Sequence, residues 1–281
     1  MRKLLITFFA MMLTLICFGS CNKNNGESTF TIRFIDVGQG DSALVECDGH
    51  YMLIDGGDST AGDTVYNVLV ENGIQKLDIL AISHLHADHI GGLKKALTYA
   101  SSIGITISNS DYSETEVFRK VEHELSINES KITVPTTGAK YELGSAIVEV
   151  IDVSEENNGS LVLLITYGDT RYLFTGDIQE AAQTRISDKY QNQSDKAYDI
   201  DLIKMPHHGS YTGTLYRLLR TFMPEHAVIS VGKENIYGHP HKETLDLLDN
   251  DAWKVEVYRT DRDGDITVRS DGKKLYIETS R

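Results

Sequence analysis

Cysteine is scarce in this sequence, and the few cysteines present exclude a fold held together by disulfides. Three occur in 281 residues, at Cys17, Cys21 and Cys47. The first two lie in an N-terminal segment that is separate in composition from the rest of the chain, so Cys47 has no partner in the body of the protein. Its strand-like surroundings predict that it is a core residue.

Basic residues are also in deficit, with 27 Lys and Arg against 41 Asp and Glu and a formal net charge of −14. A body this acidic repels polyanions at long range, which disfavours binding of nucleic acid by bulk charge. A bound metal ion could still bind a phosphate locally, because its charge dominates the nearby field. Long apolar runs are absent beyond residue 20, where no stretch reaches the ~18 residues that a membrane-spanning helix needs.

The first 20 residues are typical of a secretory signal. A short basic start is followed by an apolar stretch over residues 4–16 and then by the small residues Gly19 and Ser20. The ending 18–21 resembles a bacterial lipobox, which would make Cys21 an acylated first residue. We expect an exported lipoprotein, anchored to a membrane rather than spanning it and facing the periplasm or the cell exterior. Simple cleavage and secretion is the alternative.

Residues 21–29 are polar and would form a tether, and residues 30–281 are predicted to form one domain. Their patterns of apolar residues alternate between strand and helix in both halves, which predicts two sheets packed together with helices outside. An acidic stretch at 261–265 predicts a hairpin turn. The expected strands are 30–37, 43–47, 51–54, 77–83, 103–107, 146–151, 161–167, 171–175, 202–205, 227–231, 255–258, 265–269 and 274–277. The expected helices are 63–71, 92–99, 114–125, 180–190, 212–221 and 244–249.

The most informative stretch is 84–89, which reads His-Leu-His-Ala-Asp-His and directly follows a predicted strand. Neutral imidazoles and carboxylates are the ligands that zinc and similar divalent metals prefer. Further candidate ligands follow other predicted strands. They are Asp177 after 171–175, His207 and His208 after 202–205, and His239 with His241 after 227–231. Seven of the ten histidines thus lie in three short motifs, a clustering that predicts a metal site.

An HxHxDH motif after a strand, a later TGD and a late His together resemble the metallo-β-lactamase fold. More specifically, the chain looks like the extracellular hydrolase domain of competence-type DNA-uptake channels. The stretches that carry this resemblance are 34–42, 83–93, 160–164, 174–178, 205–210, 237–240 and 260–265. The resemblance implies a four-layer αββα sandwich with a dinuclear metal site between the sheets.

The resemblance also implies roles for the ligands. His84 and His86 would bind a first metal, Asp88 and His89 a second, and Asp177 would bridge both. The chain departs from the family in lacking a third His before the bridging Asp, where 157–160 reads Asn-Asn-Gly-Ser.

Our hypothesis is that one His of the pair His207 and His208 supplies the missing ligand, and that His239 completes the second site. Three further residues are candidates for orienting the ligating imidazoles from behind. They are Asp36, Gln39 and Asp55.

Two divalent ions, Zn²⁺ or Mn²⁺, would lower the pKa of a bridging water towards about 7 and so supply hydroxide at neutral pH. Asp88 would then orient the nucleophile. Whichever of His207 and His208 is not a ligand could stabilise developing charge or protonate the leaving group.

The predicted function is metal-dependent hydrolysis of a phosphodiester, with DNA as the substrate that the resemblance implies. Alternatives within the same chemistry are a phosphocholine or teichoic-acid ester, a lactone or, least favoured because the third His is absent, a β-lactam. A lipoprotein that kept the fold but binds without turnover is a further alternative. No protein partner is predicted, and contact with a membrane would be through the lipid on Cys21.

Overall fold

The structure is a computed structural model that describes residues 29–154, 159–191, 199–214, 216–251 and 254–281. The predicted signal, Cys21, nearly all of the predicted tether and the Asn157–Asn158 pair lie outside the described residues.

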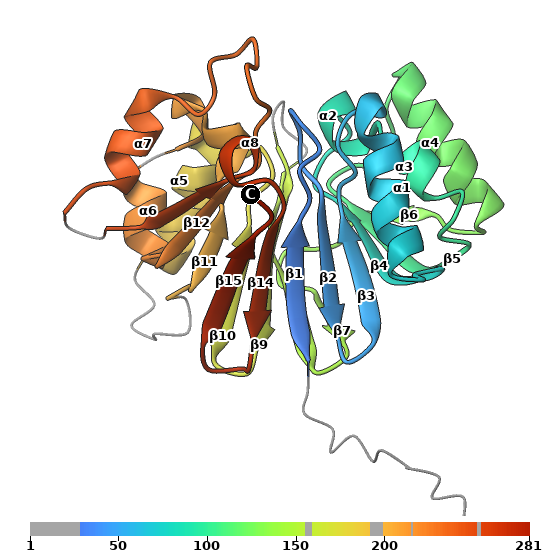
Figure 1. Cartoon of the computed structure of the whole chain (residues 1–281), viewed down its shortest axis with the longest axis horizontal. Coiled ribbons are helices and arrows are strands. Elements are labelled where there is room, and N and C mark those ends of the chain that lie inside the picture. The colour runs from blue at the N-terminus through green and yellow to red at the C-terminus, as the bar shows by residue number, and fades with distance from the viewer. Residues whose placement is uncertain (1–28, 155–158, 192–198, 215, 252–253) are drawn as a thin grey trace, which may run out of the picture.

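Two β-sheets form the centre of the molecule (Figure 1). The first has the strand order β15-β14-β1-β2-β3-β4-β5-β6 and the second the order β13-β12-β11-β10-β9-β8-β7. The first consists of β1 (Phe30–Phe34), β2 (Ala43–Cys47), β3 (His50–Ile54), β4 (Lys76–Ile82), β5 (Ser102–Ser108), β6 (Ile132–Thr133), β14 (Ile266–Ser270) and β15 (Leu275–Thr279). The second consists of β7 (Lys140–Leu143), β8 (Ala146–Val153), β9 (Leu161–Tyr167), β10 (Thr170–Phe174), β11 (Leu202–Lys204), β12 (His226–Ile229) and β13 (Glu256–Arg259).

Apolar side chains fill the space between the two sheets. Burial alternates along β1, so that Phe30, Ile32 and Phe34 face the other sheet, as the two-residue repeat of a strand requires. Phe30 stacks on Tyr172 at a ring-centroid distance of 4.9 Å. Cys47 is fully buried in this core, which confirms the prediction made for it.

Helices cover the outer face of each sheet, and the result is the four-layer αββα sandwich that the sequence predicts (Figure 1). Against the first sheet lie η1 (Ser59–Ala61), α1 (Gly62–Glu71), α2 (Ala87–Ile90), α3 (Leu93–Ala96) and α4 (Glu116–Ile127). On the side of the second sheet lie α5 (Glu180–Tyr190), η3 (Pro206–Gly209), η4 (Tyr211–Gly213), α6 (Tyr216–Phe222) and α7 (Lys242–Leu248). The helix predicted over 212–221 is therefore two shorter ones.

The prediction of a hairpin turn at 261–265 is wrong. It is a short helix, α8 (Thr260–Asp263), and the strands on either side of it belong to different sheets. The chain crosses from one sheet to the other there, so no hairpin can form. Within the described ranges, no helix has the length and apolar character needed to cross a membrane.

Parallel pairing brings the predicted ligands together. Strand β3 runs parallel to β4, and β10, β11 and β12 run parallel to one another. Strands that run in the same direction end at the same edge of their sheet, and α2, which follows β4, lies at the upper edge in Figure 1. The loops after β4, β10, β11 and β12 build the site described next.

Candidate metal centre

Four side chains form a compact set of possible metal ligands. Asp88, His89, Asp177 and His208 each offer one ligand atom, and these atoms all lie within 4.8 Å of one another. Asp88 and His89 are on α2 beside the first sheet, whereas Asp177 and His208 follow β10 and β11 of the second. The site therefore joins the two sheets at their shared edge.

Asp177 lies at the centre of this arrangement. Its Oδ1 is 3.4 Å from His89 Nε2, and its Oδ2 is 3.6 Å from His208 Nε2. The same Oδ2 is 3.9 Å from His84 Nε2 and 4.0 Å from His207 Nε2. These separations are longer than hydrogen bonds but suit groups that share a cation placed between them.

The residues fit a metal ion because buried ligand atoms among them have no hydrogen-bond partner. His84 Nε2, His89 Nε2 and Asp177 Oδ1 are all buried and unpaired within the described structure. Leaving several such atoms unsatisfied would cost free energy unless another group binds them. Metal ions bound to these atoms would remove that cost.

Hydrogen bonds behind the ligands orient His89. Its Nδ1 lies 2.9 Å from Asp55 Oδ2, so the ring donates through Nδ1 and presents Nε2 to the site. Asp55 is itself held by the backbone N–H of Ser83 at 2.7 Å and by its hydroxyl at 2.6 Å. Asp55 thus lies directly behind His89, where it would orient the ring.

His208 is oriented in the same way by groups that the sequence analysis did not single out. Its Nδ1 lies 3.1 Å from the carbonyl oxygen of Ser230 and 3.2 Å from Asp41 Oδ1. A carbonyl oxygen only accepts, so Nδ1 carries the hydrogen and Nε2 is left to bind a metal. Nε2 is 3.2 Å from Asp88 Oδ2.

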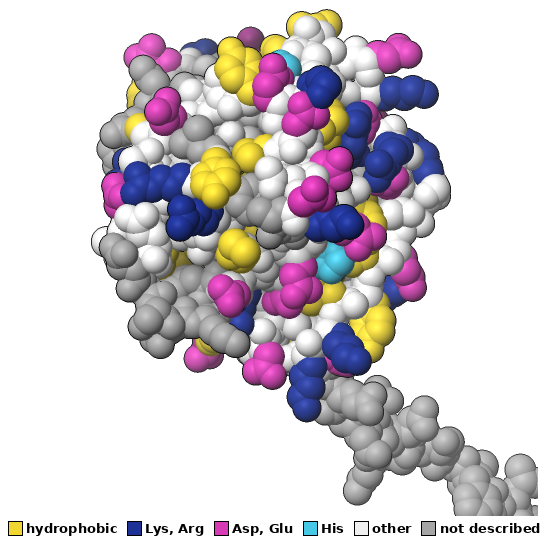
Figure 2. Space-filling model, turned by 90° about the vertical axis from the view of Figure 1, so that its left-hand side faces the viewer, with side chains coloured by type: hydrophobic (Ala, Val, Ile, Leu, Met, Phe, Trp, Pro, Cys, Tyr) yellow, Lys and Arg dark blue, Asp and Glu magenta, His cyan; other side chains and the backbone are white. Residues whose placement is uncertain are grey.

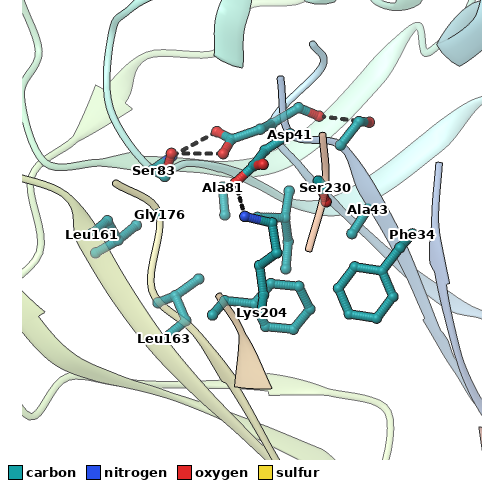
Figure 3. A pocket seen from close by; sticks show the side chains of 14 residues that line it. Phe34, Asp41, Ala43, Ala81, Ser83, Leu161, Leu163, Gly176, Lys204 and Ser230 are labelled. Carbon is teal, nitrogen blue, oxygen red and sulfur yellow. Dashed lines mark hydrogen bonds and ion pairs between the residues drawn. The ribbon is translucent and has the colours of Figure 1, made fainter. Parts of the chain in front are cut away.

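A buried lysine holds Asp41 in place. Lys204 Nζ lies 2.6 Å from Asp41 Oδ2 and donates to the carbonyl oxygen of Met205 at 2.9 Å. Both side chains are almost fully buried, with exposed fractions of 4% for Lys204 and 8% for Asp41. Figure 3 shows the lysine extending between the sheets, past Leu163, towards Asp41. A buried ion pair, Lys204 with Asp41, thus lies behind the metal centre.

The carboxylates of the site favour the protonated, positively charged forms of His208 and His89. Burial opposes protonation of His208, but the Asp177 and Asp41 carboxylates prevail and raise its pKa to about 9. Asp177 and Asp55 likewise raise the pKa of His89 well above its ordinary value, against the effect of burial. His208 and His89 in turn hold the pKa of Asp177 well below its ordinary value. In the metal-free protein, protons on these imidazoles occupy the place of a cation.

The turn that carries His208 is strained. His207 and His208 have φ of 49° and 54°, a left-handed conformation that non-glycine residues rarely adopt. Each such residue costs about 1–3 kcal/mol and persists only where the surroundings enforce it. Here the N–H of His207 donates to the Gly176 carbonyl at 3.2 Å and that of Ser210 to the His207 carbonyl at 2.8 Å.

A second, looser set of histidines surrounds the same Asp177 carboxylate. His84 is buried, and burial together with the neighbouring His89 lowers its pKa to about 3, so it is neutral and free to ligate. Its ring lies 4.5 Å from that of His86. His207 approaches the same carboxylate oxygen, Asp177 Oδ2, as His84 does. The pair predicted as alternatives is thus divided, with His208 in the compact set and His207 beside the looser one.

Three predicted residues lie outside the compact ligand set. The structure places His208, rather than His239, with Asp88 and His89; the His239 ring is 6.2 Å from that of His208. Asp36 pairs with Arg281 at 2.6 Å, and Gln39 accepts from the N–H of Gly232 at 3.1 Å. Neither of these two hydrogen bonds reaches an imidazole, so Asp36 and Gln39 tie loops together instead.

Ser160 stands in the stretch where the sequence analysis noted the absence of a third histidine. Its hydroxyl accepts from the N–H of Asp177 at 2.9 Å and so orients that residue. Gly176 makes this approach possible, since a Cβ there would lie 2.6 Å from Ser160 Oγ. Ser160 therefore acts on the backbone beside the ligand rather than on a metal.

Two curated proteins are similar in sequence to most of this chain. ComE operon protein 3 of Bacillus subtilis is 28% identical over 271 residues, which cover 89% of this chain and 34% of the relative. Recombination protein 2 of Haemophilus influenzae is 27% identical over 269 residues, 92% of this chain and 31% of the relative. The chain spans about a third of the length of these curated relatives.

Among solved structures, the metallo-beta-lactamase fold protein YhfI of Bacillus subtilis has the same fold. Its TM-score is 0.56 at 13% identity, and the match covers 89% of this chain and 99% of YhfI. A sequence profile of the family matches residues 35–233, which include all four residues of the compact ligand set. The chain belongs to the metallo-beta-lactamase superfamily.

Proposed function

We propose that this protein is a metal-dependent phosphodiesterase and that DNA is among its substrates. The observation that carries the proposal is the compact set of Asp88, His89, Asp177 and His208 at the edge shared by the two sheets. The superfamily and this set indicate a divalent-metal hydrolase, and the choice of a phosphodiester is the further step.

Two ions, Zn²⁺ or Mn²⁺, would be held by the compact set and by His84, His86 and His207 of the looser set. Such ions lower the pKa of bound water and polarise a phosphoryl oxygen. His207 and His208 both lie within 4.0 Å of Asp177 Oδ2, which supports a role for both histidines in a site built around this carboxylate.

The chain's own residues would complete the reaction. Asp88 is the most exposed carboxylate of the set, with 35% of its side chain accessible, and it would accept a hydrogen bond from the attacking water. His239 is neutral at pH 7, because burial and the nearby His208 lower its pKa to about 4. A neutral imidazole carries one N–H, which His239 would donate to a phosphoryl oxygen.

The names of two relatives support DNA as the phosphodiester: Recombination protein 2 refers to recombination, and Competence protein ComA of Neisseria gonorrhoeae, 26% identical over 245 residues, refers to competence. The acidic body disfavours binding through bulk charge, so a metal ion would have to supply the local attraction for phosphate. A lactone, a phosphocholine or teichoic-acid ester and a binding role without turnover remain the alternatives.

The test is hydrolysis by purified protein with Mn²⁺ or Zn²⁺ of three substrates: bis(p-nitrophenyl) phosphate, single-stranded DNA and nitrocefin. We expect cleavage of the two phosphodiesters and none of nitrocefin, and loss of cleavage in Asp177→Asn. Metal bound at full stoichiometry without turnover of any substrate would reject the phosphodiesterase and favour a binding protein.

We also propose export and anchoring through lipid on Cys21. In the native host, Cys21→Ala is expected to move the protein from the membrane fraction to the soluble exported fraction. An unchanged distribution would reject the lipid anchor.

A further inference from the structure

Four aromatic rings lie next to the metal centre, and only one of them, His239, has a role in the proposed reaction. We call Tyr211, Tyr237, His239 and His241 the aromatic rim. Tyr211 is 58% exposed and Tyr237 is 59% exposed, although large aromatic side chains usually bury most of their surface. In Figure 1 the loop between β12 and α7, which carries three of the four, projects above the upper edge of the sandwich.

The aromatic rim is continuous with the ligand set. The His239 ring lies 5.6 Å from that of His207 and 6.2 Å from that of His208. Tyr237 stacks on His239 at 5.6 Å with an interplanar angle of 24°. On the other side, His241 lies 4.8 Å from His239, and Tyr211 follows at 5.0 Å from His241. A chain of rings thus leads from a metal ligand to the solvent.

Hydrogen bonds hold the loop of the aromatic rim in a defined shape. Asn235 Oδ1 accepts from the N–H groups of Tyr237, at 3.2 Å, and of His239, at 3.0 Å. Its Nδ2 donates to the carbonyl oxygens of Gly232 at 2.9 Å and of His239 at 2.7 Å. The N–H of Tyr211 donates to His241 Nδ1 at 3.1 Å. Rings held in this way are preorganised, which lowers the entropy cost of binding a flat ligand.

A groove of about 540 Å³ opens at the opposite end of the site. It is lined by His84 and His86 and by residues of the β5–α4 connection, among them Tyr112, whose side chain is 66% exposed. The metal centre therefore has an open approach on one side and the aromatic rim on the other. That layout suits a chain-like substrate cut in its middle.

The charges favour stacking over backbone attraction as the source of affinity. Figure 2 shows acidic and basic side chains interspersed on the described surface of the side that carries α6 and α7. The whole chain carries a formal charge of −14. Aromatic side chains add affinity for single strands of any sequence, because every base has a face on which a ring can stack. Paired bases already stack within the duplex and do not offer that face.

We propose that the aromatic rim is a nucleobase-stacking subsite, in which Tyr237 and Tyr211 bind unpaired bases beside the phosphodiester to be cut. The subsite makes the metal centre selective for single strands over duplexes. It rests on the proposed phosphodiesterase function and adds the class of substrate to it.

The test compares a fluorescent (dT)₈ strand with a strand of equal length made of abasic units, by anisotropy in EDTA, where neither is cut. Each stacked base is expected to strengthen binding by at least about fivefold, so wild type should prefer the base-bearing strand by that factor or more. Tyr237→Ala and Tyr211→Ala should each reduce this preference, whereas Tyr237→Phe, which keeps the ring, should retain it. Tyr276→Ala is the matched control, because Tyr276 is equally exposed, at 54%, and lies on β15.

Equal affinity for the two strands, no measurable affinity for either, or an equal loss in Tyr276→Ala would overturn the proposal. Equal binding of a duplex would overturn the selectivity. Displacement of the strand by phosphocholine would indicate a cation-binding rim instead. Failure of the phosphodiesterase is seen separately, as absence of bis(p-nitrophenyl) phosphate cleavage with Mn²⁺, because the anisotropy preference needs no catalysis.

Discussion

Two carboxylates of one loop, Asp36 and Asp41, have different partners although they are five positions apart in a glycine-rich stretch. Asp41 is buried and lies 3.2 Å from the imidazole of His208. Asp36 pairs instead with Arg281 near the surface. Only the first can act on a metal ligand.

We therefore expect Asp41→Asn to weaken metal binding by about 10–100-fold, the usual cost of losing a group that orients a ligating histidine. Asp55→Asn should have an effect of the same size through His89. Metal affinity measured by titration calorimetry tests both, with Asp36→Asn as the control from the same loop. A loss in Asp36→Asn as large as that in Asp41→Asn would contradict the assignment.

The buried pair of Lys204 and Asp41 predicts an unusually costly lysine substitution. Lys204→Met would leave Asp41 buried with His208 as its remaining cationic neighbour, which costs up to about 3–5 kcal/mol of unfolding free energy. Lys76→Met removes a pair of similar length whose lysine is 62% exposed, and it should cost at most about 1 kcal/mol. Urea unfolding of both variants is the measurement. Similar losses of unfolding free energy in Lys204→Met and Lys76→Met would show that burial does not make the Lys204 pair more costly to break.

Sequence reasoning reached the candidate ligands and Asp55 behind His89, but it missed the pair of Lys204 and Asp41 behind His208. Asp88, His89, Asp177 and His208 could be found because they lie in short motifs at predicted strand ends. The contact between Lys204 and Asp41 joins two sheets, so it depends on how those sheets pack. Asp41 stood in a motif already noted for Asp36 and Gln39, and its position after the second glycine was the available signal.

At the scale of elements, the turn after β11 positions both histidines by means of a strained backbone. Three consecutive residues, His207, His208 and Gly209, have positive φ. The C-terminal end of this turn is tied to the aromatic rim, because the N–H of His241 donates to the Gly209 carbonyl at 3.0 Å. A change in the turn would therefore move ligands and rim together.

Gly209→Ala tests this coupling against a glycine of equal backbone conformation. Gly209 and Gly49 both have φ of +80°, but a Cβ on Gly209 would lie 2.7 Å from Pro240 Cβ, whereas one on Gly49 would have no atom within 4 Å. Gly49→Ala should cost about 1–2 kcal/mol from the backbone alone. Gly209→Ala should cost more and also weaken metal binding. Equal losses of thermal stability and of metal affinity in Gly209→Ala and Gly49→Ala would show that the turn does not couple the ligands to the aromatic rim.

Strands were predicted more closely than their connections. The predicted strand 161–167 coincides with β9, which is a nearly continuous apolar run. The predicted helix 180–190 coincides with α5, in which the buried Ala182, Ile186 and Tyr190 recur every four residues. The two-residue strand β6 and the left-handed turn of η3 have no such periodicity. The crossing at α8 was taken for a hairpin because acidic turn residues look alike in both settings.

At the scale of the whole molecule, protonation and metal binding compete for one cluster. The pKa of His208 in the folded, metal-free protein is about 9, above its ordinary value of 6.5. The stability that its protonation contributes is complete below about pH 6.5 and is lost as the pH rises to about 9. Bound metal needs the neutral ring and would remove this dependence.

We expect EDTA-treated protein to lose unfolding free energy between pH 6.5 and 9, and metal-loaded protein to keep it. At a free metal concentration of 100 times the dissociation constant, the metal should add about 2.7 kcal/mol. Chemical unfolding at both pH values, with and without EDTA, measures this, and His208→Gln should remove the His208 part of the fall. A metal-free stability that rises from pH 6.5 to 9 would contradict the prediction.

The ligands of the compact set come from both halves of the chain, two from beside each sheet. A chain that has folded only its first sheet has Asp88 and His89 but lacks Asp177 and His208. Such an intermediate cannot assemble the four-ligand set, and so it should not catalyse hydrolysis through it. If the protein is exported as we propose, it would stay inert while it crosses the membrane unfolded, and activity would begin only when the last part of the sandwich has closed.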